Sequence, residues 1–171
     1  MYQDKIYVCL DNTMDLETYE IMKTWKQSNG EKFKFYDGLD LCREIEKLDD
    51  DVVKEKIRSR MLESKVCVVL IGKFTKSYRK FTRWQIECAI EKQIPIIAIN
   101  ANGIRSVDFD RCPTVLKKNL AIHISFQEPI LEFALENWPA SDLIHREEGK
   151  LTMYRYQNKV YDDLHLETYD L

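Results

Sequence analysis

The sequence predicts an α/β fold in which helices cover both faces of a doubly wound, five-stranded parallel sheet. Through the first 140 residues, short β-rich runs alternate with longer segments of helical spacing, the pattern of parallel strands joined by crossover helices. The runs at 66–71 and 95–99 are continuously apolar, as expected of central strands that are covered on both faces.

Five strands are expected, at residues 5–10, 32–36, 65–71, 95–99 and 120–126. The second of them, with the letters KFKFY, alternates between polar and apolar residues and therefore suits an edge of the sheet. We expect the first, third and fourth strands to form the middle of the sheet.

Five helices are expected, at residues 16–26, 51–63, 80–93, 113–119 and 129–138. Apolar residues recur at helical intervals in the first three of these segments. Asn29–Gly30 is expected to follow the end of the first helix, and Pro139 is expected to close the last one.

The composition changes after Pro139, so we divide the chain into a domain at 1–140 and a C-terminal extension at 141–171. The extension is rich in Tyr and charged residues, and two segments that flank Gln157–Asn158 suggest a hairpin. The extension could pack on the domain, cover an edge strand or serve as a contact in a homo-oligomer.

Composition excludes several classes of protein. A formal net charge of −3 with both signs mixed along 171 residues argues against a dedicated nucleic-acid binder. No apolar run approaches the roughly 20 residues of a membrane-spanning helix, and no signal sequence is recognisable, so we expect a cytoplasmic protein that does not bind membranes. The five cysteines are scattered and never spaced C-x-x-C, so neither a disulfide framework nor a metal site is expected.

Several common site motifs are also absent from the sequence. There is no P-loop, G-x-G-x-x-G, H-E-x-x-H or G-x-S-x-G pattern. A phosphoacceptor receiver domain would need an Asp at the end of the third strand, where this chain has Leu70, Ile71 and Gly72. In open parallel sheets, ligands bind beyond the carboxyl ends of the strands, which directs attention to the loops at 11–15, 37–50 and 72–80.

The segment at 66–100, VCVVLIGKFTKSYRKFTRWQIECAIEKQIPIIAIN, carries a resemblance to a known family. An apolar strand ending L-I-G, a T-x-S loop, a helix opening with aromatic residues and an I-I-x-I strand follow one another. This string resembles the TIR-like family of bacterial defence proteins, which includes the TIR subunit of Thoeris anti-phage systems. The resemblance covers most of 5–138, is strongest over 57–100, and implies a flavodoxin/TIR-like fold.

The resemblance also implies an activity. TIR-type enzymes cleave the nicotinamide–ribose bond of NAD⁺, which is their substrate and not a resident cofactor. The implied product is an ADP-ribose-derived messenger, cyclic or conjugated, that activates a separate effector protein. The alternatives are a non-catalytic TIR-like scaffold that assembles into oligomers, and a generic flavodoxin-like binder, for which the phosphate loop is missing.

Residue 85 decides between these hypotheses, because the resemblance places the family's catalytic Glu at Gln85. A carboxylate would stabilise the oxocarbenium-like charge that develops on the ribose, whereas an amide has no negative charge. Gln85 is therefore a solvent-facing helix residue, the mark of a natural pseudoenzyme, or a replacement of the catalytic Glu that silences activity. Phe81 stands where the family has its first Trp.

Other candidate substrate-binding residues follow the strands. Asp11 and Asn12 come after the first strand and Asp37 after the second, where they could meet a ribose or the adenine, although these residues are also ordinary turn formers. Lys73 could offset the charge of the pyrophosphate, or lie in a solvated loop. Trp84 could stack on a base or pack in the core.

Overall fold

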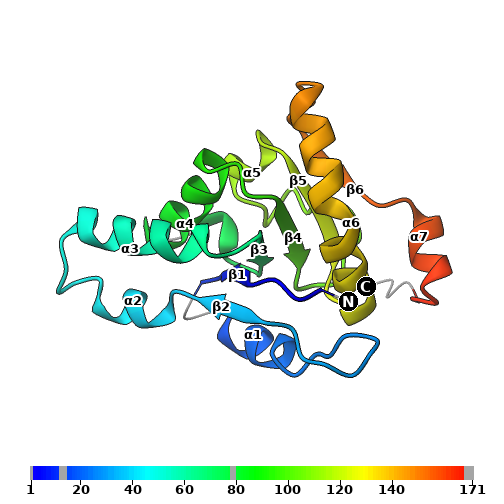
Figure 1. The fold of residues 1–171 in the computed structure, drawn as a ribbon, viewed down its shortest axis with the longest axis horizontal. Coiled ribbons are helices and arrows are strands. Elements are labelled where there is room, and N and C mark those ends of the chain that lie inside the picture. The colour runs from blue at the N-terminus through cyan, green and yellow to red at the C-terminus, as the bar shows by residue number, and fades with distance from the viewer. Residues whose placement is uncertain (1, 12–14, 78–79, 168–171) are drawn as a thin grey trace.

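The computed structural model describes residues 2–11, 15–77 and 80–167, and these residues form one parallel sheet with helices on both faces (Figure 1). The strand order is β2-β1-β3-β4-β5-β6. The predicted α/β architecture is confirmed, but the predicted number of strands is wrong, because the described residues contain six. The strands are β1 (Ile6–Cys9), β2 (Phe35–Asp37), β3 (Val66–Ile71), β4 (Ile96–Asn100), β5 (Ala121–Ser125) and β6 (Met153–Arg155).

The strand patterns explain the order of the sheet. Every residue of β1, β3, β4 and β5 is buried. The strands β1, β3 and β4 are central, as predicted, whereas β5 is central because β6 pairs with its other edge. The strand β2 lies at an edge, as its alternating pattern predicts, but it begins at Phe35, later than expected.

The helices match the expected segments with several differences. The first helix ends earlier than predicted, at Met22, and Lys26 instead forms an isolated β-bridge with Lys32. The short helix α2 was not expected, and the last predicted helix extends beyond Pro139. The helical elements are α1 (Leu16–Met22), α2 (Leu39–Glu44), α3 (Asp50–Leu62), the 3₁₀ turn η1 (Thr75–Ser77), α4 (Lys80–Glu91), α5 (Thr114–Lys117), α6 (Glu128–Glu147) and α7 (Asn158–Asp163).

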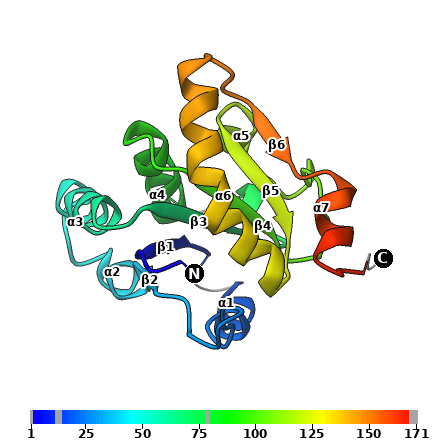
Figure 2. The same cartoon turned by 45° about the vertical axis from the view of Figure 1, so that its right-hand side comes forward.

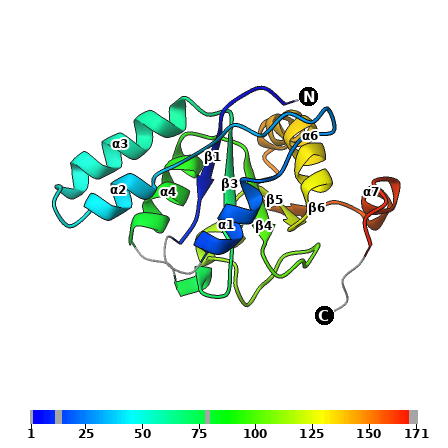
Figure 3. The same cartoon turned by 90° about the horizontal axis from the view of Figure 1, so that it is seen from below.

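The sheet separates two hydrophobic cores. On one face, α1 and α6 pack on alternate residues of the strands, together with Tyr161 of α7. On the other face, α2, α3, α4 and α5 pack on the intervening residues. Figures 2 and 3 show these two layers, with α3 and α4 on one side of the strands and α1 and α6 on the other.

The topology directs ligands to one place on the sheet. From β1 the chain crosses to β2 on one side and then returns to β3 on the other side of β1. The loops that leave the carboxyl ends of β1 and β3 therefore diverge, and this switch point is where open α/β sheets bind their ligands.

The predicted end of the last helix at Pro139 is wrong, because α6 continues to Glu147. Proline removes one backbone donor, but buried contacts on both sides of it hold the helix together. Trp138 is buried before it, and the buried carboxylate of Asp142 accepts a hydrogen bond from Arg146 Nε at 2.6 Å after it. The boundary that we expected at residue 140 thus falls inside a continuous helix.

The predicted hairpin in the C-terminal extension is also wrong. Residues 153–155 pair in parallel with β5, with Ile122 opposite Tyr154, and residues 158–163 form α7. Gln157 is the N-cap of α7, so the Gln157–Asn158 pair begins a helix instead of a turn. Of the three roles left open for the extension, the structure shows the first two, because Tyr161 packs in the core of the domain and β6 covers the free edge of β5.

None of the helices in the described part of the chain is both long and apolar enough to span a membrane. All five cysteines are free thiols.

Candidate functional site

Gln85 lies on the inner face of α4 and is buried against the sheet. The apolar face of this helix, which includes Phe81, Ile86 and Ala89, packs in the core, and Gln85 shares that face one turn after Phe81. The side chain is only 1% exposed. The interpretation of Gln85 as a solvent-facing helix residue is therefore wrong.

Both polar ends of the Gln85 amide are hydrogen-bonded. The Tyr7 hydroxyl donates to Gln85 Oε1 at 2.8 Å, and Gln85 Nε2 donates to the backbone oxygen of Phe81 at 3.3 Å. Because one end accepts and the other donates, this pair of partners suits an amide. The amide thus sits in the core without an unsatisfied polar atom.

Gly38 covers this cluster from the turn between β2 and α2. A β-carbon added to Gly38 would lie 2.8 Å from the Tyr7 hydroxyl and 2.9 Å from Phe81 Cζ, closer than side chains pack. It would also lie 3.5 Å from Gln85 Oε1. Only glycine permits the turn to approach so closely, so Tyr7, Gly38, Phe81 and Gln85 form one cluster, which we call the Gln85 cluster.

Burial fixes the protonation of this cluster. Burial raises the pKa of the Tyr7 hydroxyl well above its usual value, and the neighbouring Cys9 and Cys67 thiols raise it further. Burial likewise raises the pKa of both thiols. Tyr7 therefore remains a neutral hydrogen-bond donor at physiological pH.

Asp37, the candidate after β2, fixes the turn that carries Gly38. Its carboxylate accepts hydrogen bonds from the Tyr19 hydroxyl at 2.9 Å and from the Leu39 amide at 3.0 Å. Its backbone oxygen accepts a hydrogen bond from Arg60 at 3.2 Å. In this arrangement Asp37 lies beside the Gln85 cluster and orders its covering turn.

Arg60 ties α3 to the same turn through a second acidic residue. Its guanidinium makes a bidentate pair with the Asp40 carboxylate, with nitrogen–oxygen distances of 2.5 and 2.6 Å. This bonding to Arg60 lowers the pKa of Asp40 to about 2. The turn at Gly38 is therefore held from both α1 and α3.

A second polar cluster lies at the switch point between β1 and β3. The Asp15 carboxylate accepts hydrogen bonds from the Asp11 amide at 3.3 Å and from the Thr75 hydroxyl at 3.5 Å. The Gly72 amide donates to the Thr75 hydroxyl oxygen at 2.8 Å. This switch-point cluster joins the loop after β1 to the turn η1 after β3.

Asp15 carries the perturbed carboxyl of the switch-point cluster. The residue is 3% exposed, and burial raises the pKa of its carboxyl to about 6, although the hydrogen bonds from Asp11 and Thr75 oppose that shift. A β-carbon on Gly72 would overlap the Asp15 carboxylate, so glycine is required there. A carboxyl poised near neutral pH beside the ligand-binding edge is a typical feature of functional sites.

Helix α4 connects the two clusters. Its Thr82 hydroxyl donates to the backbone oxygen of Leu10 at 3.5 Å, at the end of β1. The candidate Asp11, which is buried at that end, thus lies between the switch-point cluster and the first turn of α4. The predicted Asn12 lies outside the described residues.

Two predicted site residues lie away from these clusters. The ring of Trp84 is half-buried in an open groove of about 430 Å³ between α3 and α4, and the ammonium groups of Lys54 and Lys80 lie 4.8 and 5.1 Å from its centre. Trp84 thus packs against the core on the α3–α4 face, in a groove that Gln85 does not line. Lys73 is exposed, and its ammonium lies over the ring of Phe74.

Sequence reasoning missed Tyr7, Gly38 and Asp15. Tyr7 lies inside the apolar run of β1 and looks like core, and its partner Gln85 is 78 residues away. In the sequence, Asp37–Gly38 looks like an ordinary turn. Asp15 looks like the residue that begins a helix. The positions of the two glycines directly after strands were the one available signal, because close backbone approach requires glycine.

Among residues 2–11, 15–77 and 80–167, no cluster of three or more His, Cys, Asp or Glu side chains is arranged to hold a metal ion.

Comparison with known families places this geometry in context. The family model described as "Thoeris protein ThsB, TIR-like domain" matches residues 7–106, which is more than half of the chain. The chain belongs to the Thoeris ThsB TIR-like family. No curated protein matches it.

The matched segment of this Thoeris TIR-like domain contains both clusters. It runs from Tyr7 to beyond β4 and includes Gly38, Phe81 and Gln85 as well as Asp15 and Gly72. Strands β5 and β6 and helices α6 and α7 follow the match. Membership places the chain among TIR domains of anti-phage defence.

Proposed function

We propose that this chain is an NAD⁺-consuming signalling domain of anti-phage defence whose bond cleavage is impaired by Gln85. The reaction breaks the nicotinamide–ribose bond in the cytoplasm and forms an ADP-ribose-derived messenger, cyclic or conjugated, that activates a separate effector protein. Family membership supports the defence role. The observation that carries the proposal is that Gln85 is buried at the sheet face of α4, where the Tyr7 hydroxyl donates a hydrogen bond to it.

The missing charge explains the impairment. Departure of nicotinamide leaves oxocarbenium-like positive charge on the ribose, as in glycoside hydrolysis. A carboxylate at position 85 stabilises that charge, whereas the Gln85 amide has none to offer. Loss of one such electrostatic contribution costs roughly 100-fold or more in rate.

The covering turn must move for the reaction to occur. Gly38 packs directly over the Gln85 cluster, so a ribose reaches position 85 only when the β2–α2 turn shifts outward. That shift breaks the polar bonds of Asp37, Asp40 and Arg60 that hold the turn. It must also be accommodated by α2, whose Leu41 is buried in the core. Substrate binding thus replaces the contact that Gly38 makes in the free protein.

The remaining substrate contacts come from the loops at the carboxyl edge of the sheet. Asp11 and Asp37 flank the α4 end of the site from β1 and β2, where they can accept hydrogen bonds from ribose hydroxyls. Lys73 is exposed just beyond β3 and supplies positive charge for the pyrophosphate. Trp84 is not part of this proposal, because its ring lies in the groove between α3 and α4.

A matched pair of variants tests the proposal. The chain, Gln85→Glu and the control Gln157→Glu are incubated with NAD⁺, and nicotinamide release is followed. Gln157 is exposed at the start of α7, so its replacement adds the same charge far from α4. We expect release to rise about 100-fold or more in Gln85→Glu only. Equal rates in all three proteins contradict an NAD⁺-consuming site at residue 85.

A non-catalytic TIR-like scaffold is the second candidate, and one observation favours it. Both hydrogen bonds of the Gln85 amide are satisfied inside the core, as in a purely structural residue. A scaffold assembles into homo-oligomers or filaments without NAD⁺ and gives no heat in a calorimetric titration with it. An NAD⁺-consuming domain with a silenced site still binds its substrate in that titration.

A further inference from the structure

The hydroxyl of Tyr7 has a defined task in the Gln85 cluster. Tyr7 lies in the central strand β1, is fully buried, and directs its hydroxyl at Gln85 Oε1 at 2.8 Å. Gly38 closes the other side of this hydroxyl. A buried hydroxyl in a hydrophobic strand needs a partner, and the side chain at position 85 provides it.

A carboxylate at position 85 would meet the same donor but a different second neighbour. Its first oxygen would still accept from Tyr7, whereas its other oxygen would take the place of the amide nitrogen, 3.3 Å from the Phe81 carbonyl. Two acceptors cannot share a hydrogen bond, so that oxygen turns away from Phe81. The Tyr7 hydroxyl then becomes the one fixed contact of the carboxylate.

We propose that Tyr7 is a positioning residue: its hydroxyl anchors the side chain at position 85, and it stabilises the negative charge when that side chain is a carboxylate. The inference deepens the proposed function and rests on it for its catalytic consequence. The anchoring itself rests on the geometry of Tyr7, Gly38 and Gln85 alone.

Other groups around the Tyr7 hydroxyl do not replace it. Cys9 and Cys67 from β1 and β3 are neutral thiols, because burial raises the pKa of each. Asp37 from β2 is engaged by Tyr19 and Leu39. Arg60 from α3 lowers the pKa of Tyr7 but is itself paired with Asp40. Tyr7 is therefore the neutral donor in direct contact with position 85.

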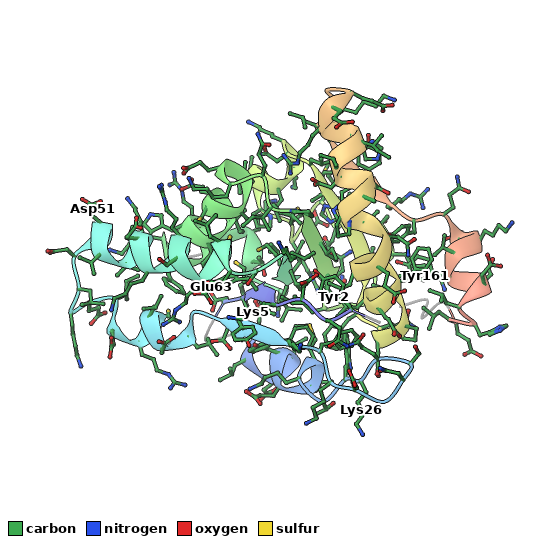
Figure 4. The ribbon with its side chains drawn as sticks, in the orientation of Figure 1. Tyr2, Lys5, Lys26, Asp51, Glu63 and Tyr161 are labelled. Carbon is green, nitrogen blue, oxygen red and sulfur yellow. The ribbon has the colours of Figure 1, made fainter. Side chains whose placement is uncertain are left out.

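The kinetic test uses the active background. Gln85→Glu, Tyr7→Phe/Gln85→Glu and the control Tyr161→Phe/Gln85→Glu are compared for NAD⁺ cleavage from pH 4 to 9. Tyr161 is another buried tyrosine, and Figure 4 shows it on the far side of the molecule from Asp51 of α3. We expect Tyr7→Phe to move the acid limb of kcat up by about 1 to 2 pH units, with KM changed less than about twofold. The control retains the parent profile.

A spectroscopic readout tests the anchor without activity. The ¹³C signal of the carboxyl introduced at position 85 is titrated in Gln85→Glu and in Tyr7→Phe/Gln85→Glu. The expected result is a midpoint that is about 1 to 2 pH units higher without the hydroxyl. An unchanged midpoint overturns the proposal. If Gln85→Glu cleaves no NAD⁺ but the midpoint moves as expected, the anchor stands and the proposed function fails.

A second substitution covers the case in which Tyr7→Phe does not fold. Incorporation of 3-fluorotyrosine at position 7 of Gln85→Glu keeps the shape and the hydroxyl but makes that hydroxyl a stronger donor. The midpoint of the introduced carboxyl should then fall below its value in Gln85→Glu with an ordinary tyrosine. A midpoint that stays in place contradicts the anchoring role.

Discussion

Asp15 and Gly72 approach each other so closely that each restricts the other. The Asp15 carboxylate occupies the space that a β-carbon on Gly72 would fill, and it bonds to Thr75 on the same turn. The strand β3 ends at this point, so little adjustment of the backbone is available. The identity of one residue is thus set by the side chain of another that is distant in sequence.

This contact predicts a specific rescue. Gly72→Ala forces the Asp15 carboxylate out of its site and should destabilise the fold by about 1 to 3 kcal/mol, as overpacking does. Asp15→Ala removes the obstacle, so the double variant should be more stable than the sum of the two single effects predicts. Urea unfolding of the four proteins measures this coupling. Additive effects would contradict the contact.

The position of Gln85 on α4 followed from its spacing to Phe81, whereas its burial did not. The two hydrogen bonds that satisfy the amide come from the backbone one turn earlier and from Tyr7, 78 residues away. Glutamine favours helices whether it is exposed or buried, so its helix propensity does not indicate burial. Long-range contacts of this kind appear only when the sheet is assembled.

At the level of elements, apolar runs identified the central strands and helical spacing identified most helices. The segment that forms β6 was expected to be one arm of a hairpin, but its partner was wrong, because its three residues are half-buried or exposed and do not show which strand they join. The segment becomes a strand by pairing with β5. Its strand structure therefore depends on the free edge of β5 more than on its own residues. The continuation of α6 through Pro139 likewise depends on buried Trp138 and Asp142.

We predict that the last helix, α7, unfolds together with the rest of the domain. Tyr161 of α7 is fully buried, packs with α6 and β5, and accepts a hydrogen bond from the Ser125 amide at 3.3 Å. Tyr161→Ala should therefore cost about 3 to 5 kcal/mol, as for other large buried side chains. The control Leu151→Ala, at a side chain that is 53% exposed, should change stability by less than about 0.5 kcal/mol.

Chemical unfolding measures both variants. Equal stability of Tyr161→Ala and Leu151→Ala would show that the segment after α6 is not part of the cooperative fold.

At the level of the whole molecule, two buried groups give opposite pH dependences. Burial raises the pKa of Asp15 to about 6 and lowers the pKa of His123 to about 4. Neither ring nitrogen of His123 has a hydrogen-bond partner in the described part of the chain. Between about pH 4 and 6, folded Asp15 binds more protons than unfolded Asp, whereas folded His123 binds fewer than unfolded His.

The two effects therefore oppose each other in this range. As pH rises from 4 to 6, the stability contributed by Asp15 falls by about 2 kcal/mol, because its protonated form is favoured in the fold. Over the range from 4 to 6.5 the contribution of His123 rises by a similar amount. The contributions of Asp15 and His123 thus partly cancel in the pH dependence of the parent chain's stability.

Single replacements separate the two contributions. The stability of Asp15→Asn relative to the parent should increase by about 2 kcal/mol between pH 4 and 6. The stability of His123→Leu relative to the parent should decrease over the same range. Urea unfolding at several pH values gives both differences. A difference that stays constant with pH in either variant would contradict the corresponding shift.

The two halves of the fold differ in what they contribute. The family match contains the switch point, the Gln85 cluster and the helices α2, α3 and α4, whereas the part that follows it completes the sheet with β5 and β6. Lys5 and Glu63 lie side by side in Figure 4, and Lys5 Nζ donates a hydrogen bond to Glu63 Oε2 at 2.7 Å. This ion pair joins the start of β1 to the end of α3, at the opposite edge of the sheet from the switch point. The candidate site residues thus lie in the first 100 residues or so, and the rest of the chain completes the sheet around them.

For the whole molecule, we propose that the absence of a negative charge at position 85 limits NAD⁺ cleavage. The rate of nicotinamide release measures this effect. The initial rate is measured for the chain and for Gln85→Glu at the same NAD⁺ concentration and at pH values above the titration of the new carboxyl. We expect the rate in Gln85→Glu to be about 100-fold higher or more. A Gln85→Glu protein that folds and binds NAD⁺ yet releases nicotinamide no faster than the chain would contradict it.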